Sequence, residues 1–206
     1  MTRAALYIDG FNLYHSIDDL GDANLKWLNL WHLGQYLSAE RSLELQKAVY
    51  CSAYRISSYE SKSRHKIYIS ALESVNVESI IGHYVVVPTP ECENCGFFGE
   101  KPNEKQSDIN VALSVFNDAR NDVFDTAFIV SADSDQAATA RFMKDNFPEK
   151  SVVFVAPPLK SPPEKAAGIS GTKVRKLSEQ DIRKCLFPIN VMREDKPPLR
   201  RPAAWD

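Results

Sequence analysis

The stretch from Ala4 to Asp9 constrains the fold of this chain more than any other feature. Five apolar residues, Ala4 to Ile8, follow one another without a helical period, and Asp9 ends the run. Such a run is typical of a strand that is buried on both faces in the middle of a parallel sheet. Asp9 then falls at the carboxyl end of that strand, where open α/β sheets bind their ligands. The alternative is that Asp9 only caps the following helix, since Asp is a preferred N-cap.

Length and composition place the chain among ordinary globular proteins. Its 206 residues suffice for one domain with a sizeable core. No stretch approaches the roughly 18 apolar residues that a membrane span needs, and no signal sequence is recognisable, so we expect a cytoplasmic protein without a membrane partner. Because the formal net charge is only −2, binding to a polyanion would depend on local basic patches or metal ions.

The remainder of the chain alternates strands with helices. Strands are expected at 4–8, 46–54, 80–87, 127–130 and 152–156, and helices at 12–20, 30–37, 58–75, from 107 onwards, at 135–146 and at 178–186. This alternation predicts an α/β fold in which helices cover both faces of a parallel sheet. We expect one domain over 1–187, interrupted by an irregular loop at 88–105, and a flexible tail at 188–206 that contains Pro and Arg.

Several carboxylates fall where the elements of this fold begin or end. Asp9 and Asp133 each follow a buried apolar strand, so they converge if those strands are neighbours. Asp108 opens the helix that starts at Ser107 and lies on the edge of its apolar stripe, and Asp135 opens the next helix. The alternative for Asp108 and Asp135 is helix capping, because an acid at a helix N-terminus complements the helix dipole.

Carboxylates that lie close together repel one another and have raised pKa values unless a cation neutralises them. Mg²⁺ is usually held by a few carboxylates, with water or phosphate oxygens at its remaining positions, and Mn²⁺ is the other candidate. The chemistry that this predicts is attack of metal-activated water on a phosphodiester. Such a mechanism requires neither a histidine nor a cysteine nucleophile.

Three segments, 7–12, 104–110 and 130–135, resemble in this order the successive motifs of the NYN domain family of PIN-like nucleases. The resemblance spans about residues 4–187. It implies a PIN-like, Rossmann-like three-layer fold with strand order 3-2-1-4-5 and a metal-dependent ribonuclease site. Two departures affect the approach of substrate: Ala132 stands where the family commonly has glycine, and the residues at 136–138 replace a more apolar continuation that contains proline.

The resemblance also implies roles for individual residues. Asp9, Asp108 and Asp133 correspond to the metal ligands, and Asn12 to an amide near the scissile phosphate. Asp135 is implied as a further acid of the site. The predicted catalytic residues are therefore Asp9, Asn12, Asp108, Asp133 and Asp135.

Three further residues are predicted to bind the substrate. Lys105 precedes Asp108 in the second motif and is placed to touch a phosphate, although a solvated loop lysine is an equal alternative. Ser131 and Ser134 belong to the third motif, and we assign them to the substrate as well.

Cys92 and Cys95 have the spacing of half a zinc site. A structural zinc site needs four ligands, and a second pair with this spacing is absent from the sequence. His83, Cys51 or Cys185 would have to complete a Zn²⁺ site, or two chains would have to share an ion. The alternative is a pair of reduced thiols in an irregular loop.

We therefore expect a Mg²⁺- or Mn²⁺-dependent endoribonuclease that acts on single-stranded or flexible RNA. One alternative is an RNA-binding or regulatory module that keeps the fold without cleaving. Another is a phosphatase of small substrates, although the Asp-x-Asp pair that such enzymes carry after the first strand is absent. The sequence leaves open the RNA target, the preference for RNA over DNA, and a homodimer.

Overall fold

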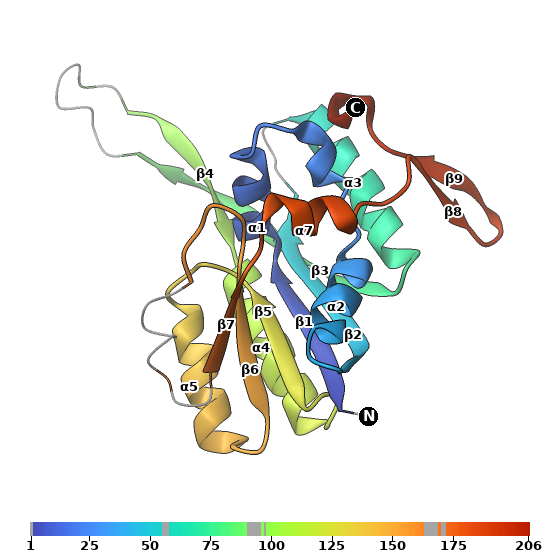
Figure 1. Ribbon diagram of the computed structural model, residues 1–206. Helices are drawn as coiled ribbons and strands as arrows, with labels where there is room; N and C mark the ends of the chain where they lie inside the picture. Colours follow the sequence, from blue (N-terminus) through green and yellow to red (C-terminus); the bar gives the residue numbers. More distant parts are fainter. Residues whose placement is uncertain (1, 55–57, 90–95, 97, 163–168, 170–171) are drawn as a thin grey trace.

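The computed structural model describes residues 2–54, 58–89, 96, 98–162, 169 and 172–206. A seven-stranded sheet with the order β4-β3-β2-β1-β5-β6-β7 forms its centre (Figure 1). All neighbours in this sheet are parallel except β3 and β4. The strands are β1 Arg3–Asp9, β2 Glu44–Ala53, β3 Val77–Pro88, β4 Glu100–Lys105, β5 Thr126–Val130, β6 Ser151–Ala156 and β7 Thr172–Lys176.

Helices cover both faces of this sheet. They are α1 Gly10–Asp18, α2 Leu30–Ala39, α3 Tyr59–Glu73, α4 Ser107–Arg120, α5 Gln136–Asn146 and α7 Glu179–Lys184, with short 3₁₀ helices η1 Ala23–Lys26 and η2 Ala203–Trp205. A separate hairpin joins β8 Asn190–Arg193 to β9 Lys196–Arg200. In the part of the chain that the structure describes, no helix has both the length and the apolar character to cross a membrane.

The predicted fold class and strand order are confirmed. The five strands expected from the sequence are β1, β2, β3, β5 and β6, and they lie in the sheet in the order β3-β2-β1-β5-β6. This is the predicted order 3-2-1-4-5. The prediction missed the two edge strands, β4 and β7, because their residues carry no apolar run that marks a strand.

The loop expected over 88–105 is partly a strand. Pro88 ends β3 opposite Glu100, and β4 then pairs antiparallel with β3 as far as Lys105. This strand-paired ribbon extends away from the body of the molecule in Figure 1. Close pairing depends on Gly82, because a Cβ there would lie 2.5 Å from the Lys105 carbonyl oxygen.

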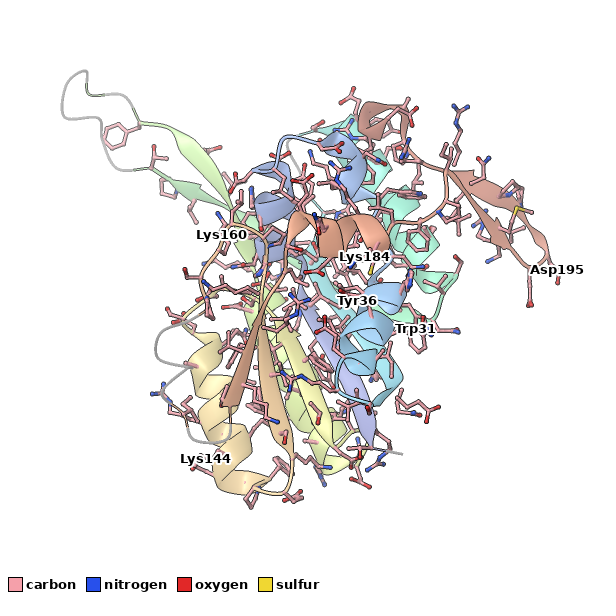
Figure 2. The ribbon with its side chains drawn as sticks, viewed as in Figure 1. Trp31, Tyr36, Lys144, Lys160, Lys184 and Asp195 are labelled. Atoms are coloured by element: carbon pink, nitrogen blue, oxygen red, sulfur yellow. The ribbon has the colours of Figure 1, made fainter. Side chains whose placement is uncertain are left out.

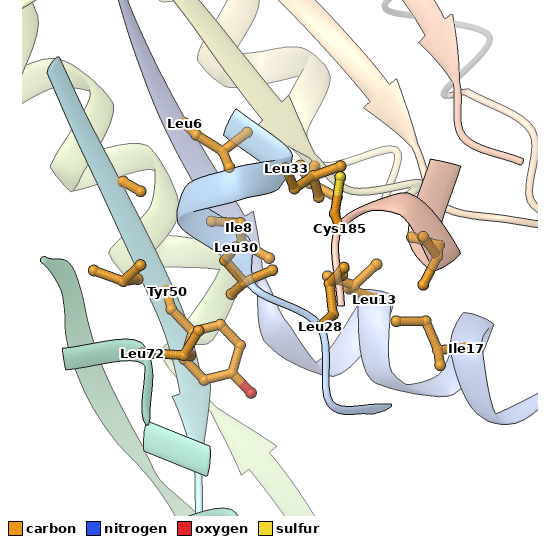
Figure 3. Close-up of a cluster of buried hydrophobic side chains, with 14 of the residues drawn as sticks. Leu6, Ile8, Leu13, Ile17, Leu28, Leu30, Leu33, Tyr50, Leu72 and Cys185 are labelled. Carbon is orange, nitrogen blue, oxygen red and sulfur yellow. The ribbon is translucent and has the colours of Figure 1, made fainter. Parts of the chain in front are cut away.

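β1 is buried on both faces, as its apolar run predicts. Leu6 and Ile8 belong to a core that α1, α2, α3 and α7 cover. Figure 3 shows their side chains near those of Leu30 and Leu33 of α2. Ala5 and Tyr7 point to the opposite core, beneath α4 and α5. Each core takes alternate residues of the same strand.

The last nineteen or so residues do not form the flexible tail that the sequence predicts. The β8–β9 hairpin projects from the body (Figure 1), yet Val191 of β8 belongs to the first core. Trp205, near the end of the chain, is 7% exposed. Its ring lies 6.1 Å from that of Trp27 and 5.9 Å from that of Tyr68. The segment is thus folded onto the domain, because an indole ring is too apolar to stay in water when a core lies within reach.

A contact between two helices closes the first core on its outer side. The hydroxyl of Tyr36 on α2 donates to the carboxylate of Asp181 on α7 at 2.9 Å. The ammonium of Lys184 lies 5.3 Å from the centre of the Tyr36 ring. Figure 2 shows the side chains of Tyr36 and Lys184 next to each other, with Trp31 also on α2.

Candidate functional site

The carboxyl ends of three neighbouring strands meet at the site. Asp9 ends β1 opposite Cys51 of β2, and Ile8 lies opposite Val130, the last residue of β5. The loop that leaves β5 therefore begins beside Asp9. The convergence of Asp9 with the acids after β5 was predicted on the condition that these strands are neighbours, and they are.

Asp9 is a buried carboxylate, with 5% of the residue exposed. Its Oδ1 accepts a hydrogen bond from the backbone N–H of Asn12 at 3.0 Å, so it does cap α1. Burial raises its pKa to about 6; the hydrogen bonds from Asn12 and Ser131 oppose this rise, and the charges of Asp133 and Glu104 add to it. Asp9 therefore caps α1, and its carboxylate also lies within reach of the charges of Asp133 and Glu104. Its role in chemistry stays a prediction.

Ser131 links Asp9 to the loop that follows β5. It is fully buried, its hydroxyl donates to Asp9 Oδ2 at 3.2 Å, and the same oxygen accepts the backbone N–H of Asp133 at 3.0 Å. The Asp133 carboxylate in turn accepts the backbone N–H of Asp135 at 2.9 Å. Ser131 therefore fixes the relative placement of Asp9 and Asp133, whereas Ser134 is exposed on the outside of the same loop.

Glu104 is a member of this site that sequence reasoning missed. It lies near the end of β4, and its Oε1 accepts both the backbone N–H of Ser107 at 3.1 Å and the Ser107 hydroxyl at 2.6 Å. Its charge also contributes to the raised pKa of Asp9. Its place as first residue of the second motif was the available signal.

Gln136 was missed as well. It is buried, and its amide nitrogen donates to the backbone carbonyl of Asp108 at 2.9 Å, while its amide oxygen accepts from Thr139. This bond ties the start of α5 to the start of α4. The sequence marked position 136 only as a departure from the family pattern.

Asp108 and Asp135 lie at the starts of α4 and α5. Both line a shallow groove between α4 and α5, together with Gln136. The Asp108 carboxylate accepts the backbone N–H of Ile109 at 2.9 Å, and Asp135 occupies the N-cap position of α5 without a side-chain bond to the helix.

The predicted ligand trio of Asp9, Asp108 and Asp133 is therefore not brought together. Among the residues that the structure describes, no three His, Cys, Asp or Glu side chains are grouped closely enough to hold a metal ion. The physical reason is the start of α4. Glu104 binds the first N–H of this helix and faces the site, while Asp108, in the first turn, faces the groove beside α5.

The remaining predicted residues lie at the margin of the site or outside the described residues. Lys105 is exposed at the end of β4, opposite His83 of β3, whose ring bonds the Gln106 amide. Cys92 and Cys95 lie outside the described residues, so the zinc prediction stays a prediction. Cys51 and Cys185 are buried in opposite cores, where burial raises their thiol pKa values to about 12 and about 11. They cannot complete one site together.

The chemical type of the donors at this edge of the sheet suits a divalent cation. Asp9, Asp133 and Glu104 supply carboxylate oxygens, which Mg²⁺ and Mn²⁺ prefer. One or two carboxylates are enough for Mg²⁺, since water and substrate oxygens complete its shell. The raised pKa of Asp9 also marks a place where negative charge lacks compensation.

The fold and the site define the class of protein: a three-layer α/β domain with a buried acid at the carboxyl ends of its central strands. No family model matches the chain. The chain is similar to the 6-hydroxy-3-succinoylpyridine 3-monooxygenase HspA of Pseudomonas putida, with 29% identity over 178 residues. The match covers 69% of this chain and 55% of that protein, so the chain spans about half the length of its curated relative.

A solved structure supports the fold. It is a protein of unknown function, VPA0982, from Vibrio parahaemolyticus, which superposes with a TM-score of 0.54 at 17% identity. The match covers 86% of this chain and 94% of that one. The chain is thus a distant homologue of one protein with an enzyme name and shares its fold with another, and neither relative fixes the reaction.

Proposed function

We propose that this chain is a metal-dependent endoribonuclease. The observation that carries the proposal is the Asp9 carboxylate, which is buried at the carboxyl end of the central strand and has its pKa raised to about 6 by burial and by the charges of Asp133 and Glu104. Acids with perturbed pKa values in such places cluster at functional sites. The resemblance of three ordered segments to PIN-like nucleases supports the same reaction.

In this proposal Asp9 holds the ion together with one further carboxylate, that of Asp133 or of Glu104, and Asp108 takes no part. Water and substrate oxygens complete the shell of the ion. The bound ion supplies Lewis-acid activation of a water and of the phosphodiester. Ser131 keeps Asp9 and Asp133 in fixed relation by bonding both. The exposed ammonium of Lys105 attracts the RNA backbone towards the site, because a lysine binds phosphate as a point charge.

The proposal is tested by incubating the purified protein with end-labelled RNA and DNA in Mn²⁺, Mg²⁺ or EDTA. Cleavage should require the ion and leave 5′-phosphate ends, because activated water rather than the ribose 2′-hydroxyl attacks. Asp9→Asn should lower cleavage at least about a hundredfold, and so should whichever of Asp133→Asn and Glu104→Gln removes the second ligand. Ends with a 2′,3′-cyclic phosphate, or full activity in EDTA, contradict the mechanism.

Asp195→Asn is the matched control. Asp195 lies at the tip of the β8–β9 hairpin, far from the sheet edge in Figure 2. Its φ of 53° is one that Asn tolerates as well as Asp does. This variant loses one carboxylate without touching the site and should cleave at the wild-type rate. RNA that is bound and never cut would support the alternative of an RNA-binding module.

A second candidate function comes from the name of the Pseudomonas relative, which is a monooxygenase of a hydroxypyridine. The observation that favours it is a cavity of about 390 Å³ that borders Gly10 and carries aromatic side chains on its walls. Oxygenation of an aromatic ring also needs an electron donor. Oxygen uptake that depends on both 6-hydroxy-3-succinoylpyridine and a reduced nicotinamide would establish this candidate. If folded wild-type protein takes up no oxygen under these conditions, the candidate is dismissed.

A further inference from the structure

The cavity of about 390 Å³ lies between α1, the end of β2 and the first half of α3, and Trp205 of η2 forms part of its wall. Ligand pockets for small molecules start at about 300 Å³, so this cavity is large enough for one nucleotide-sized group. The residue roles in the proposed ribonuclease do not use it.

The cavity begins one residue from the buried acid. Gly10 follows Asp9 directly, and Ser52 follows Cys51, the strand partner of Asp9; both line the cavity. A Cβ at position 10 would lie 2.4 Å from the Tyr50 ring and 2.9 Å from the Cys51 carbonyl oxygen. Glycine therefore lets α1 start directly against β2, which brings the cavity wall next to the acidic site.

Aromatic side chains form one wall of the cavity and remain open to solvent. Phe11 and Tyr14, three residues apart on α1, are each 41% exposed. The ring of His15 stands edge-on to Phe11, with 4.3 Å between the ring centres. Exposed aromatic faces of this kind are where unpaired bases stack.

The charged side chains of the cavity are cationic. Lys26 and Arg64 line it, and the described residues that line it include no Asp or Glu. The Arg64 guanidinium donates to the Ser61 hydroxyl at 3.0 Å, and no carboxylate of the described residues lies within ion-pair distance of it. Lys26 pairs with Asp18 at the rim and lies over the Tyr14 ring. The charge of Glu60, one turn earlier on α3, acts on Arg64 without forming an ion pair, so the guanidinium keeps donors for an anion.

The inner wall offers neutral polar groups. His65 bonds the Tyr50 hydroxyl at 3.2 Å, and burial lowers the pKa of its imidazole to about 4, so it carries no charge at neutral pH. A neutral imidazole and the Ser52 hydroxyl can hydrogen-bond to the edge of a base. The cavity therefore combines stacking surfaces, an unpaired guanidinium and uncharged hydrogen-bonding groups.

We propose that this cavity binds a nucleotide, with its base against Phe11 and Tyr14 and its phosphate at Arg64. The nucleotide has two sources, a free mononucleotide or an unpaired residue of an RNA strand whose next phosphate lies at Asp9. The second source rests on the proposed ribonuclease function and specifies its substrate as a strand with an unpaired base beside the cleavage site. A planar fork of donors such as Arg64 suits a phosphate better than a lysine would.

The test is calorimetric titration in EDTA, so that nothing is cleaved. The probes are AMP, UMP, benzoate as an aromatic acid without a nucleoside, and an eight-residue RNA in single-stranded and duplex form. Wild-type protein should bind the nucleotides and the single strand, and benzoate and the duplex at least tenfold more weakly. Tight binding of the single strand with none of the mononucleotides assigns the cavity to RNA.

Two variants tie the binding to the cavity. Phe11→Ala and Arg64→Gln should each weaken nucleotide binding at least tenfold, and Arg64→Gln should also reduce its salt dependence. The matched controls are Phe142→Ala, a 45% exposed aromatic on α5, and Arg120→Gln, an exposed arginine on α4; both should bind as wild type does. Circular dichroism of each variant shows that it is folded, and Tyr14→Ala replaces Phe11→Ala if the latter is not.

Benzoate binding as tight as AMP binding, or binding of neither a mononucleotide nor the single strand at millimolar concentration, overturns the inference. Its failure is distinguishable from failure of the ribonuclease proposal. RNA cleavage that Phe11→Ala and Arg64→Gln leave unchanged overturns the assignment of the cavity to the RNA substrate while the proposed function stands. Nucleotide binding by a protein that never cleaves RNA supports the cavity assignment and contradicts the ribonuclease.

Discussion

The side-chain amide oxygen of Asn12 accepts the backbone N–H of Ala132 at 3.0 Å, across 120 residues of sequence. The bond joins the first turn of α1 to the loop after β5. The backbone N–H of the same Asn12 donates to Asp9. Asn12 therefore connects both halves of the candidate site by its own hydrogen bonds. This structural role explains an asparagine at position 12 whether or not its side chain also contacts substrate.

Replacing Asn12 by Ala should release the loop after β5. The lost hydrogen bond costs about 1 kcal/mol in the free energy of unfolding, which denaturant titration measures. Amide hydrogen exchange at Ala132 should accelerate, since its N–H loses its acceptor. Asn190→Ala, at an exposed position of β8, is the control and should change neither quantity. Unaltered exchange at Ala132 would show that the bond does not hold the loop.

The pKa of Asp9 predicts a pH dependence with a definite sign. Its pKa is raised to about 6 in the folded protein, against about 3.9 in an unfolded chain. The protonated form is therefore favoured by folding, and stability from this group is complete below pH 4 and is lost as pH rises through 6. Asp9→Asn removes this dependence.

The free energies of unfolding of wild type and Asp9→Asn should accordingly diverge with pH in EDTA. From pH 4 to pH 8 the variant should gain about 2 to 3 kcal/mol relative to wild type. Using this difference cancels the contribution of His65, whose lowered pKa acts with the opposite sign because its protonation below pH 6.5 favours unfolding. Mn²⁺ at pH 8 should stabilise wild type and leave the variant unchanged. A difference that stays constant with pH contradicts the assignment of a raised pKa.

Sequence patterns predicted the fold because each central strand can be recognised from its own uninterrupted apolar run. Residues 4–8 and 127–130 are apolar without interruption, which only a strand covered on both faces requires. The edge strands carry no such signal. β4 has the sequence EKPNEK and is held by backbone pairing to β3, a tertiary effect that no local pattern expresses.

The site was predicted in part, for a related reason. Asp9 and Asp133 follow apolar strands, so topology alone brings them to one edge of the sheet. The start of α4 at Ser107 was predicted correctly, but the bonds that Ser107 makes to Glu104 ahead of the helix were not visible in the sequence. Gln106, which precedes α4, has a φ of 82°, and the charge of Glu104 just before it contributes to the raised pKa of Asp9.

A buried charge network on the other face of the sheet predicts a stability effect without a functional one. Asp118 of α4 is 2% exposed and accepts from the Tyr7 hydroxyl at 2.9 Å. The Lys47 ammonium lies 3.0 Å from the same carboxylate and 3.0 Å from that of Glu78. Lys47→Met leaves Asp118 without its cation and should lower the free energy of unfolding by about 3 kcal/mol. The double variant Lys47→Met with Asp118→Asn should recover part of this loss, and RNA cleavage by folded protein should be unchanged in both.

The folded C-terminal segment gives the last prediction. A flexible tail would contribute nothing to stability, whereas Trp205 is 7% exposed and packs against Trp27 and Tyr68. Trp205→Ala should therefore lower the free energy of unfolding by about 3 kcal/mol, as truncation of a buried aromatic side chain does. Met192→Ala is the matched control from the same segment, since Met192 is 76% exposed and its truncation should change stability by less than about 0.5 kcal/mol. Equal midpoints of denaturation for Trp205→Ala and wild type would mean that the segment does not pack on the first core in solution.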